Sequence, residues 1–115
     1  MRGARLAAAA LLGAAAAALS SPALAEGGDP RAGRRLAGGQ CAACHGNDGI
    51  AVAPGAPNLA GQVADYVAAQ LRAYRSGERR NEVMSVAAQA LTDAQIADLA
   101  AWYAAIEVEA RVPGR

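Results

Sequence analysis

Two cysteines and a histidine stand together in the first half of the chain, in the order Cys41-Ala42-Ala43-Cys44-His45. Two thiols at this spacing can each form a thioether with a vinyl group on one edge of a porphyrin. The histidine that follows then lies beneath the iron and presents a neutral imidazole as an axial ligand. The spacing therefore predicts one haem c, attached through Cys41 and Cys44 and ligated by His45.

Three other kinds of site also use paired cysteines. A dithiol redox pair has the same spacing, but it needs no histidine at the next position and usually lies at a strand-to-helix junction, which this sequence does not predict. A zinc site needs further donors, and the chain holds no second Cys/His pair. A disulfide would close a very small loop and stabilise little. We favour haem attachment over these three.

The other axial position of the iron needs a donor from elsewhere in the chain. His45 is the only histidine, and Met84 is the only methionine after Met1. A lone methionine more often fills a core, but a thioether sulfur is also a soft donor that raises the reduction potential of a His-ligated haem. We expect Met84 to be the distal ligand. Protein ligands on both faces leave no open position at the iron, which favours an electron carrier over an enzyme.

Helical patterns surround these residues, with no strand alternation and no internal repeat. Residues 46–61 are rich in glycine and proline, have no helical period and predict a long loop. The first expected helix is 30–37, opened by Asp29-Pro30 and ended by Gly38-Gly39. A second has an apolar stripe from Val63 to Tyr74 and is ended by Gly77. A turn of helix is expected near 86–89, and a last helix over 93–107, opened by the capping box Thr92-Asp93-Ala94-Gln95. The sequence thus predicts an all-α fold.

The first 25 residues predict an export signal. Arg2 and Arg5 precede a Leu/Ala/Gly run from Leu6 to Leu19, and the small residues Ala23-Leu24-Ala25 follow. The run has 14 residues, which is short of the roughly 20 that span a bilayer and disfavours a permanent membrane anchor. We therefore expect residues 1–25 to be removed as a signal peptide, leaving residues 26–115 as one periplasmic domain without stable membrane insertion.

The charge and apolar content of residues 26–115 narrow the function further. Nine arginines stand against ten acidic side chains, with no lysine, which excludes the dense basic surface of a nucleic-acid-binding protein. Most of these arginines cluster in residues 31–35 and 72–80. Such clusters are either solvated faces or docking sites. Four aromatic side chains and many alanines make a thin core, so a large prosthetic group would supply apolar mass.

Together these motifs resemble bacterial class I cytochromes c, in particular the short single-haem members similar to cytochromes c553 and c5 and to one half of cytochrome c4. The resemblance covers residues 29–106 and includes Gly33, Cys41-Ala42-Ala43-Cys44-His45-Gly46, Pro57-Asn58-Leu59-Ala60-Gly61-Gln62, Tyr66, Gln70-Leu71, Arg75-Ser76-Gly77, Arg80-Asn81, Met84 and Leu99-Ala100-Ala101-Trp102-Tyr103. It implies three to four short helices wrapped around one covalently attached haem.

The resemblance also implies roles for residues beside the haem. The Pro57 carbonyl would accept a hydrogen bond from His45, and Leu59 would pack on the proximal haem face. Gly33 would let the first and last helices cross closely beneath Trp102 or Tyr103, unless it is merely a weak helix position.

Six further residues are weaker candidates. Tyr66, Tyr74 and Arg75, with Arg72 and Arg79, are candidate partners for the haem propionates, and Asn81 is a candidate partner for the Met84 sulfur. Core, surface or loop-shaping roles explain each of them equally well.

The expected function is that of a monomeric electron carrier whose partners are redox proteins. Nucleic acid is not an expected partner. The family implies a quinol-oxidising complex on one side and a terminal oxidase or another reductase on the other, in weak and brief encounters. Two alternatives stay open: a haem c subunit that accepts electrons from a periplasmic dehydrogenase, and a ligand-binding haem protein whose sixth ligand is displaceable.

Overall fold

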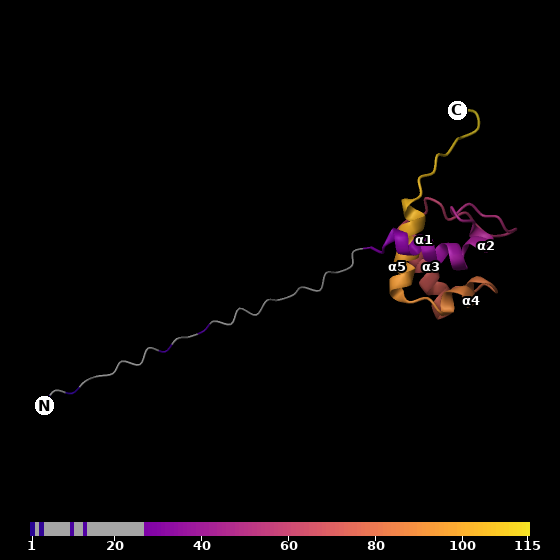
Figure 1. Cartoon of the computed structure of the whole chain (residues 1–115). Helices are drawn as coiled ribbons and strands as arrows, with labels where there is room; N and C mark the ends of the chain where they lie inside the picture. The colour runs from indigo at the N-terminus through magenta and orange to yellow at the C-terminus, as the bar shows by residue number, and fades with distance from the viewer. Residues whose placement is uncertain (2, 4–9, 11–12, 14–26) are drawn as a thin grey trace.

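The computed structural model describes residues 1, 3, 10, 13 and 27–115. The predicted signal peptide, residues 1–25, thus lies outside the described residues except for four isolated positions. The described part contains five helices and no strand (Figure 1): α1 (Pro30–Gln40), α2 (Ala42–His45), α3 (Ala64–Ser76), α4 (Met84–Gln89) and α5 (Asp93–Ala105). The all-α prediction is confirmed, with α2 as a helical turn that the sequence patterns did not indicate.

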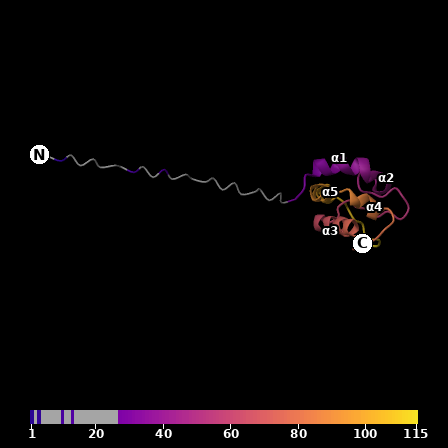
Figure 2. The same cartoon turned by 90° about the horizontal axis from the view of Figure 1, so that it is seen from below.

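Helix α5 lies between α1 and α3 (Figure 2), and it packs against both. The core forms along this contact from the buried residues Ala37, Leu91, Ile96, Leu99 and Tyr103. In both views the two short helices, α2 and α4, lie on the same side of α5. Segments far apart in the sequence therefore lie near each other on that side. None of the described helices is long and apolar enough to cross a membrane.

Gly33 brings α1 and α5 into close contact. It is buried, and a Cβ atom at this position would overlap the Asp98 carbonyl and lie 2.8 Å from the Trp102 Cβ. The Asp98 side chain also accepts a hydrogen bond from the Asp29 backbone nitrogen at 2.7 Å, which ties the start of α1 to α5. The crossing expected at Gly33 and Trp102 is present, and it requires the missing side chain.

The predicted end of the first helix at Gly38-Gly39 is wrong, because α1 continues to Gln40. A glycine that ends a helix usually adopts a positive φ, and neither of these two glycines does. Instead the Cys41 nitrogen donates to the Ala37 carbonyl at 2.8 Å, so the helical bonding continues past both glycines. Helix α1 thereby delivers the first cysteine directly from its last turn.

Helix α3 ends as predicted at Gly77, which has a left-handed φ of 82°, but its apolar stripe is only half correct. Val67 is buried, whereas Val63 is 64% exposed and Tyr66 is 50% exposed. Val63 lies before the helix, in extended backbone at its N-cap position. The inward face of α3 therefore starts at Val67, and the first turn faces solvent.

The last two helices also differ from the prediction at their ends. Helix α4 begins at Met84, two residues before the predicted turn. Helix α5 has the predicted capping box between Thr92 and Gln95, and it buries Ile96, Leu99, Ala100 and Tyr103. It ends at Ala105, because Ile106 turns to extended backbone with ψ 119°.

Candidate functional site

Cys41 comes directly before a single helical turn, and Cys44 lies within that turn. Helix α2 starts directly after Cys41, and the His45 nitrogen donates to the Cys41 carbonyl at 3.0 Å. The Cys44 carbonyl accepts hydrogen bonds from Val52 at 2.9 Å and Ala53 at 3.2 Å, so the following loop folds back over the turn. Both thiols are free and half-buried. This arrangement holds two thiols and one imidazole on a short rigid segment.

The Cys41 thiol lies beside the buried hydroxyl of Tyr103. Burial raises the pKa of Cys41, and the Tyr103 hydroxyl lowers it by a smaller amount. Burial also raises the pKa of Tyr103, and the nearby thiol adds to that shift. Within the described residues the hydroxyl has no partner in good hydrogen-bond geometry. Burial thus disfavours the charged forms of both the Cys41 thiol and the Tyr103 hydroxyl.

His45 is 7% exposed, and its Nδ1 atom lies 2.8 Å from the Pro57 carbonyl oxygen. A carbonyl can only accept, so Nδ1 carries the proton and donates it. The lone pair on Nε2 then stays free, and the hydrogen bond fixes the orientation of the ring. A histidine held in this way has the tautomer and the position of a metal ligand.

The loop of residues 46–61 positions Pro57 through its own hydrogen bonds. The Gly49 carbonyl accepts from Leu59 at 2.7 Å and from Ala60 at 3.0 Å. The Asn58 side chain accepts from the Ala51 nitrogen at 2.8 Å and closes the loop from the other side. Leu59 is half-buried and packs against the core. The sequence predicts no role for Asn58, because an asparagine within a proline- and glycine-rich loop carries no periodic signal.

A cavity of about 90 Å³ joins the cysteine segment to the methionine helix. Its lining is almost entirely apolar and comprises Gln40, Cys41, Leu71, Met84, Ala87, Leu91 and Leu99. Cys41 and Met84 come from opposite halves of the chain, yet they share this space. Two thiols, an imidazole whose Nε2 is free and a thioether sulfur are a donor set that suits a haem, and two of these four side chains, Cys41 and Met84, line this apolar cavity.

Met84 opens α4, and Asn81 lies three positions before it. The Asn81 side-chain oxygen accepts hydrogen bonds from the nitrogens of Val83 at 2.9 Å and Met84 at 3.0 Å. The Asn81 nitrogen donates to Ser85 Oγ at 3.0 Å. These bonds join Asn81 to the Met84 backbone; a contact with its sulfur stays a prediction.

The other candidate residues lie on α3. Arg75 donates to the Leu91 carbonyl at 3.0 Å and pairs with Asp93 at 2.6 Å, which links α3 to the start of α5. The ring of Tyr74 lies under the Arg79 guanidinium at 4.7 Å, and Tyr66 is half-exposed. The contacts that we expected between these side chains and haem propionates stay predictions.

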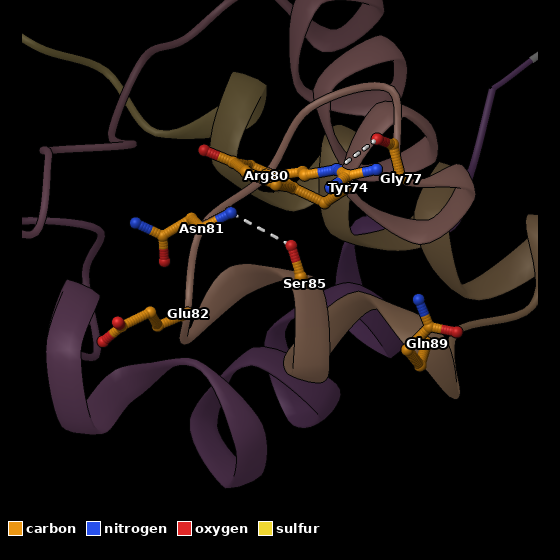
Figure 3. Close-up of a pocket in the computed structure, with 7 residues that line it drawn as sticks. All are labelled: Tyr74, Gly77, Arg80, Asn81, Glu82, Ser85 and Gln89. Atoms are coloured by element: carbon orange, nitrogen blue, oxygen red, sulfur yellow. Dashed lines mark hydrogen bonds between the residues drawn. The ribbon is translucent and has the colours of Figure 1, made fainter.

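A second, larger hollow of about 560 Å³ opens to solvent beside α3 and α4 (Figure 3). Its lining comprises Tyr74, Gly77, Arg80, Asn81, Glu82, Ser85 and Gln89. It contains none of the residues predicted to hold a haem, whereas Cys41 and Met84 both line the smaller cavity.

A comparison with known protein families now identifies the chain. The family model described as cytochrome c matches residues 30–105, which span all five helices. The chain belongs to the cytochrome c family. Its members are electron carriers rather than enzymes, and Cys41 and Cys44 are the cysteines for its covalent haem c.

Individual cytochromes show the same similarity. Cytochrome c-554(548) of Halomonas halodenitrificans is 47% identical over 72 residues, which cover 60% of this chain and 87% of that protein. The thiosulfate dehydrogenase electron acceptor of Stutzerimonas stutzeri is 41% identical over 68 residues, covering 56% of this chain and 32% of that protein. The reduced cytochrome c4 structure from Pseudomonas stutzeri superposes with a TM-score of 0.63 at 28% identity, covering 70% of this chain and 52% of that one. This cytochrome c thus spans most of the first relative and about half or less of the others.

Proposed function

We propose that this cytochrome c is a periplasmic one-electron carrier whose haem iron is ligated by His45 and Met84. The observation that carries the proposal is the 2.8 Å contact between His45 Nδ1 and the Pro57 carbonyl. Because Nδ1 donates to that carbonyl, Nε2 is the nitrogen left to bind iron, and the hydrogen bond makes it a stronger donor. The haem supplies an iron that alternates between the ferrous and ferric states.

Met84 is the proposed ligand on the other face. Its position on the same apolar cavity as Cys41 supports this role, and a thioether favours the reduced iron. Leu59, half-buried against the core, is proposed to pack on the His45 side of the ring. If His45 and Met84 both bound the haem iron, no position would be left there for a substrate, and the chain would accept and release one electron at a time.

The carbon monoxide spectrum of the reduced protein tests this ligation. A His/Met carrier should form the carbon monoxide complex slowly or not at all, since Met84 must first leave the iron. Rapid complex formation would instead support the alternative function of a ligand-binding haem protein with a displaceable sixth ligand.

Export and processing form a second part of the proposal. The basic start, apolar run and small-residue triplet of residues 1–25 support a signal peptide, and residues 26–115 would be the mature domain. Mass spectrometry of the exported protein tests both points at once. We expect a chain that starts at Glu26 and carries the added mass of one haem; a mature chain that retains Met1 would contradict cleavage.

The proposed electron donor is a dehydrogenase, with a quinol-oxidising complex as the alternative and a terminal oxidase or another reductase as the acceptor. The relative named as an electron acceptor of thiosulfate dehydrogenase supports this choice. The same relative favours a second function, in which the chain is a stable haem c subunit of such an enzyme. A native gel separates the two, because a free carrier migrates as a monomer and a subunit co-migrates with its dehydrogenase.

A further inference from the structure

We propose that Asn81 is a positioning residue that keeps Met84 on the haem iron by fixing its backbone, not by touching its sulfur. This inference rests on the proposed His45/Met84 ligation. It concerns how tightly the sixth ligand is held, which determines whether small molecules gain access to the metal.

The first argument is the weak apolar packing of the segment that bears the ligand. Helix α4 has only 6 residues, and Ala88 is its single buried side chain. Its apolar neighbours face solvent, with Val83 61% and Val86 73% exposed. Apolar burial therefore contributes little to the position of Met84, and segments of this kind open locally at low cost.

The second argument is the set of hydrogen bonds that Asn81 makes instead. One side-chain oxygen accepts from the nitrogens of both Val83 and Met84, at 2.9 and 3.0 Å. The Asn81 nitrogen and carbonyl both bond to Ser85, at 3.0 Å each, as Figure 3 shows for the nitrogen. Asn81 thus makes capping-type hydrogen bonds to the residue proposed to bind iron, while the N-cap position itself, Val83, has no side-chain cap.

The other end of α4 is held separately. Gln89 donates to the Arg75 carbonyl at 3.0 Å, and Arg75 donates to the Leu91 carbonyl at 3.0 Å. The far end of the helix is thereby anchored to α3, while Met84 at the near end depends on Asn81. Loss of the Asn81 side chain should free the first turn without unfolding the domain.

The test measures imidazole binding to the oxidised haem protein. Imidazole binds only when Met84 leaves the iron, so its apparent affinity reports the open fraction. We expect Asn81→Ala to raise that affinity roughly tenfold, the size that the loss of an N-cap interaction predicts. Asn81→Asp keeps an acceptor oxygen for both nitrogens and should stay within about twofold of the wild type.

Thr92→Ala is the matched control. It removes the N-cap of α5, where Thr92 Oγ1 accepts from Gln95 at 3.1 Å, away from Met84. It should lower the melting temperature about as much as Asn81→Ala, with imidazole affinity unchanged. If Thr92→Ala raised the imidazole affinity equally, the effect of Asn81→Ala would reflect general stability only, and the inference would be overturned.

Two further outcomes are decisive. Unchanged affinity in Asn81→Ala, or no recovery in Asn81→Asp, would overturn the positioning role alone and leave the ligation intact. If the wild type binds imidazole as tightly as Met84→Ala does, Met84 is not the ligand, and the ligation proposal fails together with this inference.

Discussion

The Nδ1 atom of His45 lies 2.8 Å from the carbonyl oxygen of Pro57, and the two residues are 12 positions apart in the chain. The bond comes from a loop, so its geometry depends on how that loop is held. Asn58 stands next to Pro57, and its side chain accepts from the Ala51 nitrogen at 2.8 Å. The orientation of His45 therefore depends on a side chain that does not touch it.

Asn58→Ala should loosen this hydrogen bond without removing it. The variant loses one side-chain acceptor, a loss of about 1 kcal/mol in the free energy of unfolding. The larger effect should be faster solvent exchange of the His45 Nδ1 proton, measured by NMR on the reduced protein. Asn47→Ala is the control, since Asn47 is an exposed asparagine of the same loop. Equal exchange rates in the two variants would contradict the role of Asn58.

Met84→Ala should leave the haem attached, because both cysteines remain, and lower the reduction potential. A thioether stabilises ferrous iron, and axial ligands set potentials over a range of roughly 0.8 V. We expect a fall on the order of 0.1 V, measured by redox titration. Val86→Ala, which changes a 73% exposed side chain two residues away, should leave the potential unchanged. A potential that does not move in Met84→Ala removes Met84 from the ligand set.

Gly33→Ala should destabilise the protein by about 1–3 kcal/mol, the usual size for forcing atoms into a packed contact. The added Cβ overlaps the Asp98 carbonyl at the crossing of α1 and α5. Gly38→Ala, in the same helix, has no atom within 4 Å of its added Cβ and should be neutral or stabilising by roughly 0.5–1 kcal/mol. Chemical denaturation of the two variants gives the comparison, and equal stabilities would contradict the close crossing.

The ion pair between Arg75 and Asp93 makes the stability of the fold depend on pH. Their contact of 2.6 Å lowers the pKa of Asp93 below its usual value of 3.8. A carboxylate with a lowered pKa stabilises the fold above the usual value and loses this effect as the pH falls through the lowered pKa.

The difference in stability between the wild type and Asp93→Asn should therefore be full at neutral pH and shrink below about pH 4. Thermal melting across this range measures it. Asp48→Asn changes an exposed carboxylate in the loop, and it should not reproduce the pattern. A difference that stays constant down to acid would show that the charge of Asp93 is not involved.

The cysteine segment shows how far the sequence leads and where it stops. Cys41, Cys44 and His45 are predictable because their chemistry depends on adjacent positions, and Thr92 and Gln95 because a capping box is local. The continuation of α1 through Gly38 was not predictable, since glycine permits a stop without requiring one. The exposure of Tyr66 and the pairing of Arg75 with Asp93 depend on tertiary contacts, on which a periodic pattern carries no information.

Cys44→Ala and His45→Ala should each prevent stable folding, because the polypeptide alone has too little core. Among the residues that the structure describes, eight apolar ones are buried and three of these are alanines, Ala37, Ala88 and Ala100, and a domain of this size is marginal even with a larger core. Binding of the prosthetic group then contributes directly to folding stability. Circular dichroism of the purified variants measures this, and both should lose most of their helical signal. Ala43→Ser, at the exposed position between the two cysteines, should retain the haem and the helices. A fully helical Cys44→Ala protein without haem would show that the polypeptide core suffices by itself.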